Sequence, residues 1–139
     1  MRIGELARRA GVSPRSVRYY ERQGLLAASR DPNGYRRYAE DDVVVVREIR
    51  ARLASGFTLA EARPFVECLR AGNPAGDVCP EPRAVYRRKL AELDACIARM
   101  TAVRDQVAAR LADAERGELL QITARPPEST RRADPTEER

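Results

Sequence analysis

Apolar residues recur every three or four positions over most of the chain, the spacing of amphipathic α-helices. The first such segment covers residues 3–10 and ends at Gly11. A second helix is expected after Ser13, a favourable N-cap residue, with Pro14 in its first turn and a stop at Gly24. Two short helices joined by a tight turn that contains glycine predict a helix-turn-helix.

A turn-rich segment separates this motif from the next helical pattern. Asp31-Pro32-Asn33-Gly34 is strong turn chemistry, and the Asn33-Gly34 pair favours a two-residue hairpin turn. Because the flanking segments are short, we expect a loop or a small β-ribbon, that is, a wing. Residues 35–38 lie on one side of it.

Two further helices are expected before the middle of the chain. Acidic residues at 40–42 open a third helix, because their charges suit its positive end. The four consecutive valines that follow are typical of a strand, but the apolar residues after them are spaced as in a helix, so we expect a helix. Gly56 ends it. Thr58 and Glu61 form a capping box that starts a fourth helix, which runs to about Leu69.

The pattern divides the chain into four parts and predicts a mainly α fold. Residues 1–70 form the winged helix-turn-helix domain, and residues 71–82, rich in glycine and proline, form a linker loop. Residues 83–117 form one long helix that Gly117 caps, and residues 118–139 form a short flexible tail without enough apolar residues to fold.

The long helix carries apolar residues at heptad spacing with one interruption at Arg104. Its seam residues are Leu90, Leu93, Ile97, Met100, Val107 and Leu111. A helix of about 33 residues spans roughly 50 Å, too long for this small domain to cover. The seam therefore predicts a coiled coil with a second copy of the chain. The alternative is a helix that folds back on the N-terminal domain.

Charge is concentrated in the helix-turn-helix region. The chain has a net charge of +5, and residues 1–39 alone hold nine arginines against Glu5, Glu21 and Asp31. A basic module on a near-neutral body indicates a polyanionic partner, and arginine suits bidentate contacts with phosphate and guanine. The alternative is a solvated face that serves solubility.

Composition excludes several other classes of protein. The start of the chain lacks the apolar segment of a signal peptide, and no run of about 18 apolar residues predicts a membrane span. We therefore expect a cytoplasmic protein without a membrane partner. The chain has no histidine, no phosphate-binding glycine loop and no paired-carboxylate motif, so we do not expect an enzyme.

The second helix and the wing hold the candidate DNA contacts, because a basic second helix of a helix-turn-helix reads the major groove. Tyr19 and Tyr20 face different sides of their helix, so one should pack in the core and the other reach the DNA backbone. The wing is expected to clamp flanking phosphates. The candidate residues are Ser13, Arg15, Ser16, Arg18, Tyr19, Tyr20, Tyr35, Arg36, Arg37 and Tyr38.

These motifs resemble the mercury-resistance-regulator (MerR) family of bacterial transcription factors. The resemblance covers roughly residues 1–117 and rests on MRIGELARRAGVSPRSVRYYERQGLL, GYRRY and the stretch from Gly56 to Glu61. It implies a homodimer joined by an antiparallel coiled coil. It also implies binding to an overlong promoter spacer between the two elements that RNA polymerase contacts, where the regulator bends and untwists the DNA in response to a signal.

The three cysteines leave the signal open. The resemblance places Cys79 where mercury and zinc sensors have their first ligand, yet no cysteine follows the long helix. Zinc needs four ligands and a soft metal at least two thiolates, so the usual metal site is not expected. Cys68 is expected to pack at the end of the fourth helix. The alternative is that Cys68 and Cys79, which bracket one loop, form a redox-switchable disulfide or a two-thiolate metal site. Cys96 is expected to pack beside the seam. The sequence therefore leaves the cofactor unknown, with a metal ion or none as the alternatives.

Overall fold

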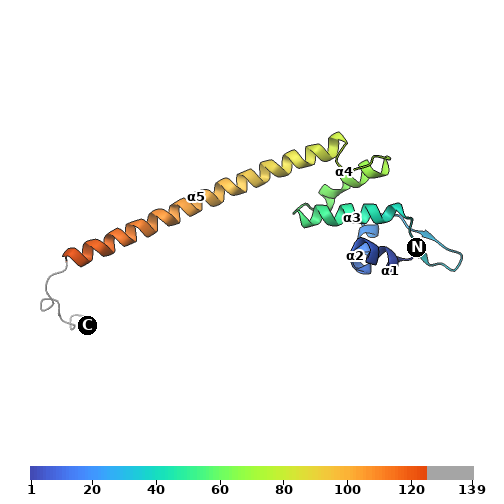
Figure 1. Ribbon diagram of the computed structural model, residues 1–139, viewed down its shortest axis with the longest axis horizontal. Coiled ribbons are helices and arrows are strands. Elements are labelled where there is room, and N and C mark those ends of the chain that lie inside the picture. Colours follow the sequence, from blue (N-terminus) through green and yellow to red (C-terminus); the bar gives the residue numbers. More distant parts are fainter. Residues whose placement is uncertain (125–139) are drawn as a thin grey trace, which may run out of the picture. The chain divides into compact units, whose positions relative to one another are not determined.

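The computed structural model describes residues 1–124 of the 139-residue chain, and it is mainly helical, as predicted (Figure 1). The chain divides into two compact units, one of residues Met1–Glu92 and one that begins at Leu93. The elements are α1 (Ile3–Ala10), α2 (Pro14–Arg22), β1 (Ser29–Arg30), β2 (Arg36–Arg37), α3 (Asp41–Ala54), α4 (Leu59–Arg70) and α5 (Pro80–Ala124). Within residues 1–124 no helix is both long and apolar enough to cross a membrane.

The helix-turn-helix forms as its turn chemistry predicts. Gly11 takes a left-handed conformation (φ 76°) at the end of α1, which a side chain would disfavour. The Ser13 hydroxyl then caps α2 by accepting a hydrogen bond of 3.1 Å from the backbone N–H of Ser16. Pro14 occupies the first turn, where its missing N–H costs no hydrogen bond.

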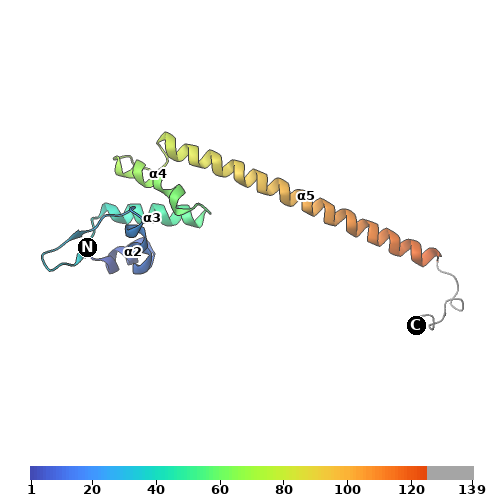
Figure 2. The ribbon, with the colours of Figure 1, turned by 180° about the vertical axis from the view of Figure 1, so that it is seen from behind.

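The wing is a small antiparallel ribbon (Figure 2). In it Ser29 pairs with Arg37 and Arg30 with Arg36. Its turn differs from the expected Asn33-Gly34 hairpin. The N–H of Gly34 donates to the carbonyl of Asp31, so Pro32 and Asn33 occupy the two corners and Gly34 follows with a φ of 85°. Proline presets the first corner, and the Asp31 carboxylate accepts from the backbone N–H groups of Asn33 and Tyr35.

The third and fourth helices form as expected and close the first unit. The four valines of α3 are helical, and three of them are buried. The capping box at the start of α4 is present, since Thr58 and Glu61 exchange side chain-to-backbone hydrogen bonds. One continuous core joins these helices to α1, α2 and the wing. Its most buried members are Leu6, Val17, Val46 and Ile49.

A second, smaller apolar cluster holds the first turns of α5 against α4. Phe65 and Val85 are fully buried in it, and the rings of Phe65 and Tyr86 lie 5.1 Å apart at a steep angle. The Lys89 ammonium lies 3.1 Å from a Glu61 carboxylate oxygen on α4. Residues 80–92 of α5 therefore belong to the first unit.

The bounds of α5 correct two predictions. The helix begins at Pro80, inside the expected linker, because proline is tolerated in the first turn of a helix. It also continues through Gly117 to Ala124, so the expected cap at Gly117 is wrong. One glycine costs a helix about 1 kcal/mol, which the helix-forming residues around it offset. The rest of the predicted tail, 125–139, lies outside the described residues.

The apolar seam of α5 is exposed. The six predicted seam residues have exposed fractions from 49 % to 68 %. Apolar side chains of this size at heptad spacing normally lie against another helix. That a second copy of the chain covers these seam residues stays a prediction.

Candidate nucleic-acid interface

The first turns of α2 present the polar residues that the sequence analysis assigned to DNA. Ser13, Arg15, Arg18 and Tyr19 are exposed, and Ser16 is half-buried. Among residues 1–124, Arg15 and Arg18 form no ion pair, so their guanidinium groups are available to a ligand. Ser13 and Ser16 already bond to each other, so Ser13 caps α2 as well as being a candidate phosphate contact, and Ser16 supplies the N–H that it caps.

The wing presents its arginines in a partly fixed arrangement. The guanidinium of Arg36 lies 3.1 Å from a Glu21 carboxylate oxygen on α2, and that of Arg37 lies 3.4 Å from Asp31. Hydrogen bonds from the backbone N–H of Tyr35, which has the larger effect, and of Asn33 hold the pKa of the Asp31 carboxyl below its usual value. The wing turn is therefore fixed by a carboxylate that stays ionised.

A basic hollow of about 300 Å³ lies between the start of α1, the middle of α2 and the wing. Its charged lining residues are four arginines: Arg2, Arg18, Arg30 and Arg36. Tyr35 also lines it, and the Arg2 guanidinium stacks 4.2 Å from the centre of the Tyr35 ring. Converging guanidinium groups of this kind fit the phosphate backbone of nucleic acid.

Arg2 and Arg30 are members of this hollow that the sequence pattern did not predict. Both were counted in the basic charge of residues 1–39, but their convergence on α2 depends on how the wing returns. Arg30 is held in place by a hydrogen bond of 2.7 Å from its guanidinium to the carbonyl of Gly34.

Two of the candidate residues are core residues instead. Tyr20 is 6 % exposed and Tyr38 is 4 % exposed, which contradicts the prediction that they contact DNA. The expectation that Tyr19 and Tyr20 face different sides is confirmed, since Tyr19 is 45 % exposed. Burial, together with a hydrogen bond of 2.9 Å from its hydroxyl to Glu21, raises the pKa of Tyr38 to about 12.

The structure joins Cys68 and Cys79 in a disulfide with Cα atoms 6.0 Å apart. As a bonded pair they offer no thiolate to a metal ion, and among residues 1–124 no cluster of three or more histidine, cysteine or acidic side chains could hold one. The donor set therefore does not fit a zinc site. Cys96 is exposed and free, and its expected packing beside a partner helix stays a prediction.

Two family models match the chain. The model described as MerR HTH family regulatory protein matches residues 1–67, and the model described as MerR, DNA binding matches residues 45–110. Among curated relatives, the HTH-type transcriptional regulator HmrR of Rhizobium leguminosarum bv. viciae is 34 % identical over 104 residues, which cover 75 % of this chain and 78 % of that protein. ZntR of Escherichia coli (strain K12) is 35 % identical over 100 residues, covering 71 % and 70 %.

Solved structures share the fold. The transcription regulator PbrR691 from Ralstonia metallidurans CH34, in complex with lead(II), matches with a TM-score of 0.63 and 28 % identity over 84 % of this chain and 85 % of that one. HiNmlR, a MerR family regulator that lacks the sensor domain and is bound to promoter DNA, matches with a TM-score of 0.52 and 22 % identity. That match covers 91 % of this chain and 96 % of the other.

Proposed function

The chain belongs to the MerR family of DNA-binding transcriptional regulators, and we propose that it acts as a homodimer on the spacer of a bacterial promoter. In this proposal α2 enters the major groove of duplex DNA and the wing contacts the flanking backbone. The dimer bends and untwists the spacer so that RNA polymerase can engage both promoter elements.

The observation that carries the DNA-binding part is the basic hollow beside α2. Arg18 lies on the exposed side of α2 and also lines the hollow, so this one side chain can reach either the major groove or the phosphate backbone of bound DNA. Arg2, Arg30 and Arg36 bring positive charge to the same place from three other segments. Neutralising several phosphates at once releases counterions, which gives tight binding that depends strongly on salt.

The exposed seam supports the homodimer. Leu93, Ile97 and Met100 are each about half exposed or more. A second α5 in antiparallel orientation would cover these side chains and give the assembly two α2 helices. Since a symmetric dimer reads two half-sites, we expect a two-fold related DNA site.

The proposed control by distortion follows from binding two half-sites on one spacer. Bending or untwisting DNA costs on the order of 1–6 kcal/mol, and contacts from both wings can offset that cost. The distorted spacer would bring the two polymerase-contacting elements onto a compatible face of the duplex.

The direct test is selection of duplex DNA from a random library with the full chain. We expect enrichment of a two-fold related sequence, an affinity that falls steeply as KCl rises, and a dimer by sedimentation analysis. Hydroxyl-radical footprinting should show two protected half-sites. No enriched sequence together with salt-insensitive binding would contradict the proposal, because four converging arginines should give a strong salt dependence.

A further inference from the structure

The loop between α4 and α5 is fastened at both ends by one covalent bond. Cys68 lies in the last turn of α4 and is 3 % exposed. Cys79 lies directly before Pro80, the first residue of α5, and is half-buried. The disulfide between them spans a sequence separation of 11 residues. It therefore controls the distance between the end of α4 and the start of α5.

A polar side chain inside the loop serves both cysteines. The Asn73 amide donates a hydrogen bond of 2.9 Å to the carbonyl of Cys68 and lies 3.3 Å from the Cys79 sulfur. The Cys68 sulfur lies 3.5 Å from the carbonyl oxygen of Ala75, so its S–H can donate there once the disulfide is reduced. The surroundings thus provide a partner for each sulfur in the dithiol form as well.

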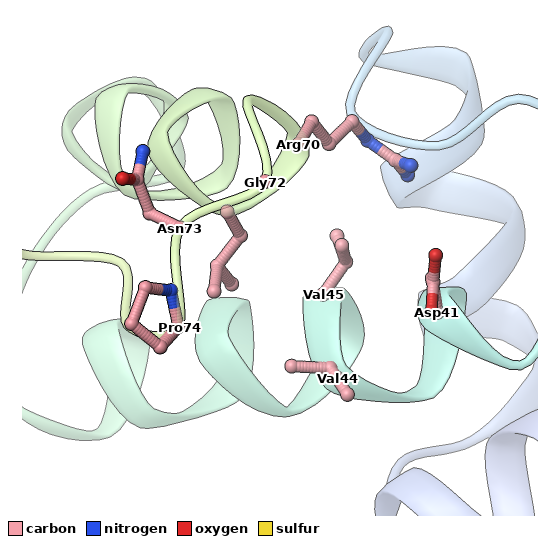
Figure 3. Close-up of a pocket in the computed structure, with 8 residues that line it drawn as sticks. Asp41, Val44, Val45, Arg70, Gly72, Asn73 and Pro74 are labelled. Atoms are coloured by element: carbon pink, nitrogen blue, oxygen red, sulfur yellow. The ribbon is translucent and has the colours of Figure 1, made fainter.

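The loop has space to move into. A hollow of about 470 Å³ separates it from the N-terminal half of α3. Figure 3 shows Gly72, Asn73 and Pro74 on the loop side of this hollow and Val44 and Val45 on the α3 side. A change in the loop can therefore be accommodated without displacing the main core.

We propose that Cys68 and Cys79 form a reversible thiol–disulfide exchange site whose redox state regulates DNA binding by this protein. The argument rests on the proposed function, because a protein that binds bacterial promoter DNA works in a compartment where thiols are kept reduced. Disulfides that form there are usually redox-sensing or catalytic rather than structural. The reacting partner is a low-molecular-weight thiol and its disulfide.

The exchange proceeds in two balanced steps. A small thiolate attacks the more accessible Cys79 sulfur, a mixed disulfide forms, and Cys68 leaves as a thiolate that takes up one proton. A second small thiolate then attacks the small-molecule sulfur of the mixed disulfide. It releases Cys79, which takes up the second proton, and a small-molecule disulfide forms. The protein gains two electrons and two protons, two small thiols are oxidised, and oxidation runs the same steps in reverse.

Contacts of α4 connect this site to the DNA-binding elements. Arg63 donates a hydrogen bond of 2.6 Å to the carbonyl of Gln23, the C-cap of α2. Arg70, two residues after Cys68, lies 3.1 Å from the buried carboxylate of Asp42 and 3.4 Å from the carbonyl of Leu25. A shift at the end of α4 therefore acts on the backbone that follows α2.

The first experiment counts thiols in the wild-type chain. The full protein is equilibrated with mixtures of reduced and oxidised glutathione, alkylated and weighed by mass spectrometry. We expect one transition from three alkylated cysteines to one, the free Cys96. Cys96→Ser is the matched control and should keep the two-thiol transition. A pair that stays oxidised, or stays reduced, at every glutathione ratio would overturn the proposal.

The second experiment measures binding of the two forms to DNA selected from a random library. We expect the apparent Kd of the oxidised and reduced protein to differ about five-fold or more, the usual size of coupling between two sites. Cys79→Ser should bind equally under both conditions. Equal affinities and equal footprints for both forms of the wild type would overturn the regulatory role. A protein whose thiols titrate but that enriches no DNA would instead refute the proposed function, and the regulatory role with it.

Discussion

Replacement of Arg18 by alanine tests the central contact of the proposed DNA interface. Arg18 is exposed, lines the basic hollow and forms no ion pair among residues 1–124. The change should therefore remove a ligand contact without breaking an internal one. Its effect on the free energy of unfolding should stay within about 0.5 kcal/mol, the usual range for surface substitutions.

The expected loss in DNA affinity follows from the kind of contact that Arg18 makes. A bidentate arginine–guanine pair contributes about 1–3 kcal/mol, which corresponds to a rise in Kd of roughly five-fold to 150-fold. If Arg18 contacts a phosphate instead, binding should weaken equally for selected and random duplexes. In that case the slope of log K against log salt should fall by about one.

Fluorescence anisotropy with a labelled duplex, over a range of KCl concentrations, measures both quantities. Arg88→Ala is the matched control, since Arg88 is an exposed arginine of α5 without an ion pair in the described part of the chain. It removes the same charge outside the basic hollow. If Arg18→Ala and Arg88→Ala bind selected DNA with the same affinity and the same salt slope, the assignment of α2 as the recognition helix is wrong.

Three other changes test the dimer, the core and the wing. Ile97→Glu should abolish dimers in sedimentation analysis because it places a charge in the seam. Ala95→Glu, the control on the same helix, should leave the dimers intact. A dimeric Ile97→Glu protein would contradict the proposal that the seam forms the dimer interface. Asp42→Ala should lower the free energy of unfolding, measured in urea, by about 2–3 kcal/mol, since it removes the partner of Arg70 and the acceptor of the Ala39 N–H. A loss no larger than that of the exposed control Asp41→Ala would count against the role of these two contacts. The pKa of Tyr38 is raised to about 12 in the folded protein, so its contribution to the free energy of unfolding is complete below pH 10 and is lost as pH rises towards 12. Tyr38→Phe should therefore reduce this alkaline loss of stability by about 2–3 kcal/mol. Identical alkaline stability profiles for the two proteins would refute the role of burial.

The sequence predicted the elements that depend on local chemistry. The Ser13 cap, the Gly11 turn and the Thr58–Glu61 capping box each need only neighbours within three or four residues, and each is present. The long helix α5 was predicted for the same reason, since heptad spacing is a local pattern, whereas the partner helix that would cover its seam stays a prediction. The cap at Gly117 failed because glycine weakens a helix without being sufficient to end it.

The features that the sequence could not predict depend on distant segments. Tyr38 follows the half-buried Arg36 and the exposed Arg37, and it is buried in the main core, where its hydroxyl donates to Glu21, which lies 17 residues earlier. The four arginines of the basic hollow come from the residue before α1, from α2 and from the wing, so their convergence becomes visible only in the fold. A disulfide between Cys68 and Cys79 was one of the alternatives that the sequence left open, beside a two-thiolate metal site and simple packing of Cys68, and only the fold brings the two sulfurs together.

Glu21 determines how the wing meets α2. One carboxylate accepts a hydrogen bond from the buried Tyr38 hydroxyl and pairs with the guanidinium of the half-buried Arg36, so it fixes the end of the ribbon against the helix. An arginine that is already positioned loses less conformational entropy when it meets a phosphate. The phosphate must then share the guanidinium with Glu21, which lowers the gain from that contact. Arg18 in the same hollow forms no ion pair with any carboxylate of residues 1–124, so Arg36 should contribute orientation while Arg18 contributes most of the affinity.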